Sequence, residues 1–177
     1  DEKTEHLGHQ FENGICIRCG GIEMERDTDG TYLISSAAQL NDFARIVNEG
    51  EYTANAKLTA DIVYNQALFD ENGAFDEQNM DTFAYFTPIG FGNACFSGTF
   101  DGNGHTIYGL YIYSKEATIQ YKPESTYLAF ISLADGAVIR NLTIQDSYIR
   151  GSQYLAGICA KGIGRTKIQN CSVLSSE

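Results

Sequence analysis

Four residues near the start of the chain have the types and the spacing of zinc ligands. His6 and His9 precede Cys16 and Cys19, so the segment offers two imidazoles and a Cys-x-x-Cys pair. Structural zinc favours four tetrahedral nitrogen and sulfur ligands, and a Cys-x-x-Cys turn presents two thiolates to one ion. A tight turn at Asn13 would fold the His arm back onto the Cys arm. The sequence therefore predicts a structural zinc knuckle; the alternative is a tail with free thiols or a disulfide between Cys16 and Cys19.

A second and weaker metal pattern lies in an acidic stretch, residues 66–87. Asp70, Asn72 and Asp76 have the oxygen ligands of a calcium loop, and Gly73 could make its turn. The EF-hand spacing fails, because no acidic residue stands where the bidentate Glu belongs. The alternative is a solvated loop held down by three phenylalanines, Phe69, Phe75 and Phe83. In both cases this insertion is an expected place for recognition, because loops on a rigid scaffold often carry binding residues.

Four tyrosines are candidates for binding a sugar, and we expect them to be exposed: Tyr108, Tyr111, Tyr113 and Tyr121. A tyrosine ring offers a flat apolar face with a polar tip, which suits a pyranose ring. Tyrosine is also common on ordinary sheet faces, so a purely structural role is the alternative. No catalytic set is predicted, because the carboxylates do not recur as a pair and His105 is expected to flank a strand.

These candidates depend on the elements that would position them. Leu40, Phe43, Ala44 and Val47 recur at helical spacing, so a helix is predicted over 36–49. Its expected N-cap is Ser35 or Ser36, and Gln39 stands three residues after Ser36, as a capping box needs. We expect this helix to cap the edge of the first strands, with its apolar stripe in the core. Short strands are predicted at 32–34 and 56–64.

Two sequence patterns recur in the second half of the chain. Residues 105–112, 138–144 and 167–173 share one pattern, and residues 127–131 are echoed at 154–158. A period of 20–50 residues with short strands indicates a solenoid. We predict three interior columns: Leu110, Leu142 and Cys171; Ile112, Ile144 and Val173; and Asn141 with Asn170, where Gly109 takes the first place. Asn141 also begins a glycosylation sequon, but a stacking position is the preferred interpretation.

Two resemblances follow from these residues. Residues 32–40, 58–62, 88–90, 96–107 and 168–171 resemble the bacterial surface β-helix proteins with GLUG-type repeats, which implies surface display and adhesion-like binding. Residues 154–158 depart from the Gly-Leu-Val-Gly core of that repeat. The segment with His9, Phe11, Gly14, Cys16, Cys19 and Gly20 resembles a short Cys/His knuckle of bacterial surface proteins.

The composition narrows the functional classes. The chain has 177 residues and a net charge of −11, with no cluster of Lys or Arg, so nucleic acid is a poor partner. No apolar run is long enough to span a bilayer. Five cysteines argue against a closed disulfide framework; Cys95, Cys159 and Cys171 are expected to be small buried residues, with a disulfide between Cys159 and Cys171 as the alternative.

Together these patterns predict an all-β fold, a right-handed single-stranded parallel β-helix with an N-terminal capping helix and a small Cys/His knuckle. Residues 1–26 would form the knuckle or a linker, and residues 31–177 the capped β-helix, with repeats expected to continue past residue 177. The predicted function is a non-catalytic, secreted or cell-surface module, monomeric, that binds a glycan or a protein. The alternatives are a carbohydrate-active β-helix enzyme, such as a polysaccharide lyase or hydrolase, and an accessory segment of a surface protease.

Overall fold

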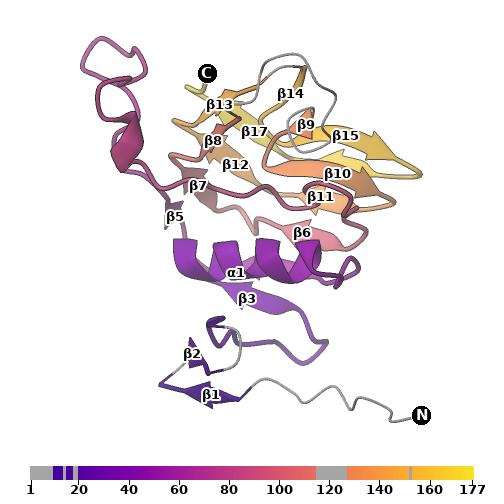
Figure 1. The fold of residues 1–177 in the computed structure, drawn as a ribbon. Helices are drawn as coiled ribbons and strands as arrows, with labels where there is room; N and C mark the ends of the chain where they lie inside the picture. The colour runs from indigo at the N-terminus through magenta and orange to yellow at the C-terminus, as the bar shows by residue number, and fades with distance from the viewer. Residues whose placement is uncertain (1–9, 14, 18–19, 115–126, 152) are drawn as a thin grey trace.

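The structure is a computed structural model of the chain, and it describes residues 10–13, 15–17, 20–114, 127–151 and 153–177. In Figure 1 the chain passes from an N-terminal hairpin, by one long helix, to layers of short strands. Its helical elements are α1 (Ala37–Asn48) and the 3-10 helix η1 (Met80–Thr82). The strands up to residue 114 are β1 (Phe11–Glu12), β2 (Ile15–Cys16), β3 (Tyr32–Ile34), β4 (Ala56–Leu58), β5 (Ile62–Val63), β6 (Thr99–Asp101), β7 (Thr106–Tyr108) and β8 (Tyr111–Tyr113). The later strands are β9 (Tyr127–Leu128), β10 (Ile131–Asp135), β11 (Val138–Arg140), β12 (Thr143–Gln145), β13 (Tyr148–Arg150), β14 (Tyr154–Leu155), β15 (Cys159–Ile163), β16 (Lys167–Gln169) and β17 (Ser172–Leu174).

Helix α1 forms where the sequence predicts a helix, so that prediction is confirmed. Ser36 is the N-cap, and its hydroxyl oxygen accepts a hydrogen bond from the Gln39 amide at 3.3 Å. The Gln39 side chain accepts in turn from the Ser35 amide at 2.8 Å, which satisfies a second free donor at the helix start. The predicted apolar stripe is the buried face of the helix: Leu40, Phe43, Ala44 and Val47.

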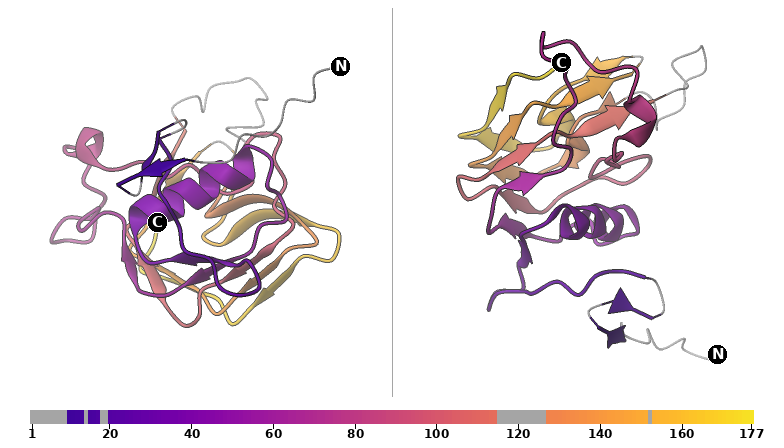
Figure 2. Two further views of the ribbon diagram at one scale, coloured as in Figure 1. Left: turned by 90° about the horizontal axis from the view of Figure 1, so that it is seen from below. Right: turned by 90° about the vertical axis from the view of Figure 1, so that its left-hand side faces the viewer.

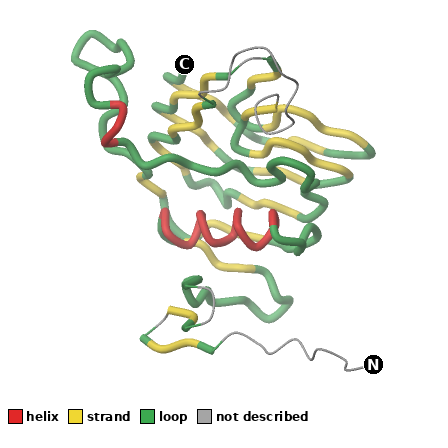
Figure 3. Tube along the Cα trace, in the orientation of Figure 1, coloured by secondary structure: helices red, strands yellow, loops and turns green. Residues whose placement is uncertain are grey.

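Most strands pair in parallel with strands far away in the sequence. A five-stranded sheet has the order β16-β11-β6-β4-β3, and a four-stranded sheet has the order β17-β12-β7-β5. Three two-stranded parallel sheets pair β10 with β15, β13 with β8, and β14 with β9, while β1 and β2 form an antiparallel hairpin. Figure 3 shows how short these strands are and how much loop separates them. Figure 2 shows that the strands border a shared interior, with α1 along one side.

The predicted single right-handed β-helix is wrong. The described strands fall into five small parallel sheets with different numbers of strands, plus the β1–β2 hairpin and the long helix. A uniform solenoid would need each repeat to supply the same strands in turn. Here β3 and β4 belong only to the five-stranded sheet, whereas β8 and β13 pair only with each other. The sequence repeats indicated parallel stacking correctly, but they are too uneven to build one continuous coil.

The register between repeats differs in part from the predicted columns. Ile139 pairs with Ile168 and Tyr127 with Tyr154, and the pairing of Ile144 with Val173 is also confirmed. The first repeat is shifted, however: Phe100 lies beside Ile139, and Ile107 beside Ile144. The predicted alignment matched β7 with β11, whereas β7 pairs with β12 and β11 pairs with β6. Leu110 and Ile112 therefore lie outside their predicted columns.

The predicted asparagine stack is confirmed for two of its members. The Asn170 side-chain amide donates to the Asn141 side-chain oxygen at 3.2 Å, and Asn141 donates onward to Asp101 Oδ1 at 3.0 Å. The third member is thus Asp101, and not the position of Gly109. Arg140 completes the group, because its Nε donates to Asp101 Oδ2 at 2.9 Å. Burial by itself would raise the pKa of Asp101, but the hydrogen bonds from Asn141, the Asn103 amide and Arg140 together lower the pKa below 3.8.

This lowered pKa predicts an acid-sensitive contribution to stability. A carboxylate with a depressed pKa in the folded state stabilises the fold above its unfolded pKa, and that contribution is lost as the pH falls through the folded pKa. Asp101→Asn should therefore reduce the free energy of unfolding by about 1–2 kcal/mol at neutral pH. The difference between the variant and the wild type should shrink as the pH falls through the lowered pKa of Asp101 in the folded protein, because the wild-type carboxyl group then becomes neutral. Urea unfolding of both proteins across this pH range measures the difference, and a difference independent of pH would contradict it.

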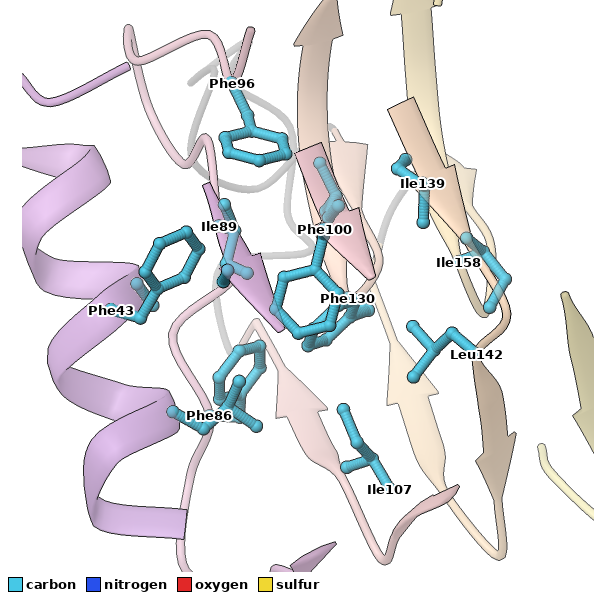
Figure 4. Packing of buried hydrophobic residues seen from close by; sticks show 14 of the residues in the cluster. Phe43, Phe86, Ile89, Phe96, Phe100, Ile107, Phe130, Ile139, Leu142 and Ile158 are labelled. Atoms are coloured by element: carbon cyan, nitrogen blue, oxygen red, sulfur yellow. The ribbon is translucent and has the colours of Figure 1, made fainter. Parts of the chain in front are cut away.

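One aromatic core joins the helix to the sheets. The ring of Phe43 on α1 meets Phe96 and Phe100 edge-on, with centroids 6.2 and 6.0 Å apart. Phe130 lies 4.9 Å from Phe100 and 5.6 Å from Phe86, centroid to centroid. Figure 4 shows these rings converging between α1 and the strands. The stripe of α1 is therefore core, as predicted, and not a cofactor groove.

The three later cysteines are less buried than predicted. Cys95, Cys159 and Cys171 are half-buried thiols, and none of them forms a disulfide, so the alternative bridge between Cys159 and Cys171 is absent. Burial raises the pKa of the Cys95 and Cys159 thiols. A thiol with a raised pKa carries less thiolate at neutral pH and is a poorer nucleophile. Cys159 and Cys171 pack against the hydrophobic core.

Candidate functional site

The outer face of the four-stranded sheet carries a row of side chains in register. Ile62, Ile107, Ile144 and Val173 share one register and point to the interior side of the strands. Because side chains alternate along a strand, their neighbours Val63, Tyr108, Gln145 and Leu174 form a row on the outer side. Val63 and Leu174 are exposed, and Tyr108 and Gln145 are half-buried. This row is an ordered mixture of aromatic, aliphatic and amide groups facing solvent.

The insertion turns part of this row into a depression of about 600 Å³. In Figure 1 the insertion leaves β5 and projects from the side of the sheets, next to β7. The lining consists of Val63, Asn65, Gln66, Ala67, Leu68, Phe69, Tyr108 and Asp146. The depression thus has a sheet floor that contains Tyr108 and a wall from the start of the insertion.

Asn65 fixes the base of the insertion and so the wall of the depression. Its side-chain amide donates to the carbonyl oxygens of Ala84 at 3.0 Å and of Gly109 at 2.8 Å, and its side-chain oxygen accepts from the Ala84 amide at 2.8 Å. These three bonds tie the start of the insertion to its end and to the turn after β7. The wall is therefore held in place before any ligand binds, which reduces the ordering cost of binding.

The polar groups of the depression suit hydroxyl groups better than charged groups. Asp146 lies in the turn after β12, and its Oδ2 accepts a hydrogen bond from the Gln145 side chain at 3.2 Å. Gln66 is exposed on the wall and offers both a donor and an acceptor. Among the described residues that line the depression, Asp146 is the only charged one. The carboxylate of Asp146 would repel an anionic ligand, and none of the described lining residues is a cation that could compensate.

The predicted sugar-binding tyrosines do not share one environment. Tyr108 lines the depression, but Tyr111 is buried at 5% exposure, so the expectation that it is exposed is wrong. Its burial raises its pKa above 10.0. Tyr113 is half-buried and stacks on Tyr111, with centroids 6.2 Å apart. Tyr121 lies outside the described residues.

Tyr111 belongs instead to an aromatic cluster that fastens the insertion to the β8–β13 sheet. The Phe75 ring stacks on Tyr148 at a centroid distance of 3.6 Å and on Tyr111 at 5.7 Å. Phe69 and Phe83 pack against the same cluster, as the solvated-loop alternative predicted. Sequence reasoning missed Tyr148, because nothing local indicates that a residue of β13 lies against an insertion that precedes it by more than sixty positions.

The predicted calcium ligands are used in turns. Asp70 Oδ1 accepts hydrogen bonds from the backbone amides of Asn72 at 2.8 Å and Ala74 at 2.9 Å. These bonds lower the pKa of Asp70 and stabilise the turn at Gly73. Asp76 Oδ2 accepts from the Asn79 side chain at 2.7 Å. Within the described ranges, no group of three or more His, Cys, Asp or Glu side chains is arranged to hold a metal ion, so the calcium prediction gains no support.

The structure describes only one of the four predicted zinc ligands. Cys16 lies on β2 and is buried at 1% exposure. The hairpin turns through Asn13, whose φ of 52° is left-handed, as the sequence predicts for a tight turn. Backbone hydrogen bonds of 2.7 Å link the Cys16 carbonyl to the Gly20 amide and the Cys16 amide to the Gly21 carbonyl. His6, His9 and Cys19 lie outside the described residues, so the zinc site stays a prediction.

His105, which was expected to flank a strand, does so. It directly precedes β7, and its Nδ1 lies 3.1 Å from Asp61 Oδ1, which also accepts from the Thr106 amide at 2.9 Å. Together these contacts lower the pKa of Asp61, with the backbone bond as the largest cause. They join the segment before β5 to the start of β7, which is a structural role.

Comparisons with protein-family models, with curated proteins and with solved structures gave no match. The resemblance to surface proteins with GLUG-type repeats is therefore neither supported nor contradicted. Within the described part of the chain, no helix combines the length and the apolar character needed to cross a bilayer.

Proposed function

We propose that the chain is a non-catalytic, secreted or cell-surface module that binds a neutral saccharide in the depression between Tyr108 and Asp146. One observation carries this proposal: the depression combines the half-buried ring of Tyr108 with exposed apolar side chains and polar side chains. A pyranose presents an apolar face of C–H groups and a rim of hydroxyl groups. The ring of Tyr108 suits the face, while Asp146 and Gln66 suit the rim.

Charge supports a neutral ligand over an acidic one. The protein has a net charge of −11, and Asp146 is the only charged residue among the described ones that line the depression. A uronate, sialate or sulfated sugar would be repelled by this carboxylate and would meet no Lys or Arg to compensate. The proposal thus favours hexose and N-acetylhexosamine polymers over anionic ones.

A glycan array followed by calorimetric titration tests the proposal, and Tyr108→Ala is the decisive variant. Removing the ring should weaken saccharide binding at least about tenfold, equivalent to ~1.4 kcal/mol, because the stacking surface is lost. Tyr154→Ala is the matched control, since Tyr154 is an exposed sheet tyrosine that stacks on Tyr127 away from the depression. It should bind like the wild type.

Two results would overturn this function. Equal loss of binding in both tyrosine variants would show that the depression is not the binding site. Depolymerisation of a bound polysaccharide, abolished by Asp146→Asn, would instead establish the carbohydrate-active enzyme as the correct class. We expect no product release from any polysaccharide that binds.

For the N-terminal segment we propose a structural zinc ion held by His6, His9, Cys16 and Cys19. The support is the ligand chemistry of the sequence together with the buried position of Cys16 in a tight hairpin. Metal analysis of tag-free protein at neutral pH should find about one zinc per chain, and Cys16→Ser should lower the zinc content. Substoichiometric zinc in the wild type would reject the site.

A further inference from the structure

The wall of the depression is held in place at two points. Its first residue, Asn65, is clamped by three hydrogen bonds to Ala84 and Gly109. Its far end is formed by Leu68 and Phe69, which line the depression. The same two side chains pack in the aromatic cluster on the β8–β13 sheet, where Leu68 is buried at 2% exposure. The depression and the aromatic cluster therefore share one segment of chain.

A short hairpin links this far end of the wall to Phe75. Phe69 and Phe75 face each other in an antiparallel bridge, and their rings meet edge-on with centroids 6.5 Å apart. The Asp76 amide donates a hydrogen bond to the Leu68 carbonyl oxygen at 2.9 Å, and Asp70 stabilises the turn between the two arms. Because these bonds make the hairpin one unit, the place of Phe75 sets the place of Leu68 and Phe69.

Ring contacts are the main attachment of this hairpin to the sheet. Among the described residues, every hydrogen bond made by residues 68–83 stays within that segment. Glu77 and Arg150 form an ion pair at 3.8 Å, but both side chains are more than half exposed, so the pair contributes little stability. The Phe75 ring stacks on Tyr148 with 3.6 Å between the centroids and 12° between the ring planes.

The surface beneath Phe75 belongs to the strands themselves. Tyr85, Tyr111 and Tyr148 are register partners in three successive layers. Their positions depend on backbone pairing between the layers, and within the described chain residues 68–83 supply none of those hydrogen bonds. In Figure 1 the insertion rises as an arm beside β8 and β13. Loss of the Phe75 contact would therefore release the hairpin and leave the sheets folded, which is a local opening.

We propose that the stack of Phe75 on Tyr148 regulates saccharide binding, with Phe75 as a positioning residue that holds Leu68 and Phe69 in the wall of the depression. The proposal rests on the saccharide-binding function proposed above. Phe75 itself is not among the residues that line the depression. When Phe75 is docked, a saccharide meets a formed wall; when it is undocked, binding must also order the wall, which lowers the affinity. Because such coupling is reciprocal, bound saccharide favours the docked hairpin by the same factor.

Hydrogen exchange in the free protein tests the positioning role. Phe75→Ala should speed exchange of the Asp76 amide at least about tenfold, because a released two-stranded hairpin is only marginally stable in water. The Ala84 amide, which belongs to the clamped base of the insertion, should exchange at the wild-type rate. Phe75→Tyr keeps the stacking ring and should restore slow exchange at Asp76. Phe91→Ala is the matched control, because Phe91 is also half-buried but packs against the main core.

Calorimetric titration tests the regulation. The probe is the neutral oligosaccharide that the wild type binds most tightly on a glycan array that includes cellotetraose and chitotetraose. Phe75→Ala should weaken its binding at least about fivefold, whereas Phe75→Tyr and Phe91→Ala should bind within about twofold of the wild type. At saturation the probe should slow exchange of the Asp76 amide in the wild type but not in Tyr108→Ala. A purely structural role of Phe75 would not produce this protection.

The possible outcomes separate the positioning role from the proposed function. Unchanged exchange at Asp76 in Phe75→Ala would overturn the positioning role. Faster exchange combined with wild-type affinity would overturn the regulation. Failure of the wild type to bind any neutral glycan would reject the proposed function and with it the regulation, while exchange in the free protein would still decide whether Phe75 positions the wall.

Discussion

Phe100→Ala is expected to lower the free energy of unfolding by about 3–5 kcal/mol, a large share of the 5–15 kcal/mol that stabilises a typical domain. Phe100 is fully buried, and its ring contacts Phe43 on α1 and Phe130, which packs on Phe86. Truncation would open a cavity where the helix and the sheets meet, so both would lose packing at once. Denaturant unfolding followed by circular dichroism measures the loss.

Tyr52→Ala is the control for this prediction. Tyr52 is 44% exposed, so removal of its ring should change the free energy of unfolding by less than about 1 kcal/mol. If the two variants were destabilised equally, the core would not be centred on the aromatic contacts between α1 and the sheets.

Gly109→Ala is expected to destabilise the protein by about 3 kcal/mol or more. The residue has a φ of 69°, and an added Cβ would lie 2.0 Å from the backbone oxygen of Asn65. Backbone must move to relieve such a contact, and here it belongs to the residue that clamps the base of the insertion. The variant should therefore also show increased hydrogen exchange at Ala84, whose amide donates to Asn65.

Gly104→Ala separates the cost of a left-handed backbone from the cost of the close contact with Asn65. Gly104 also has a left-handed φ, 83°, but an added Cβ would meet no atom within 4 Å. Its cost should be only that of placing alanine in the left-handed region, about 1–2 kcal/mol. Equal losses in the two glycine variants would show that the close approach of Asn65 to Gly109 contributes nothing.

Local patterns predicted the elements whose stability is local. The helix at Ala37–Asn48 was predicted from its apolar spacing and from Ser36 and Gln39, because capping and amphipathic burial act within a few residues. The turn at Asn13 was predicted for a similar reason. The stack of Asn141 on Asn170 joins residues 29 positions apart, and the repeated sequence pattern predicted it instead. In each case the residue type itself restricts the backbone or supplies the hydrogen bond.

The overall fold class was predicted incorrectly because the repeated pattern did not show which strands pair. The repeat pattern matched Ile107 with Ile139, but in the structure Ile107 lies beside Ile144 and Phe100 beside Ile139. The described strands form several small parallel sheets of unequal size. The repeats indicated parallel stacking, but only the tertiary structure showed which strands pair.

For the candidate sites, the sequence by itself determined the available chemistry: a His and Cys set at the N-terminus, an acidic insertion, a group of tyrosines and a negative net charge. Only the tertiary structure decided which of these groups share a location. It placed Tyr108 beside Asp146 and the wall of the insertion, buried Tyr111 against Phe75, and used Asp70 in a turn. The physical reason is that these contacts join residues tens of positions apart, and their geometry depends on parallel strand register and on Asn65 holding the insertion in place.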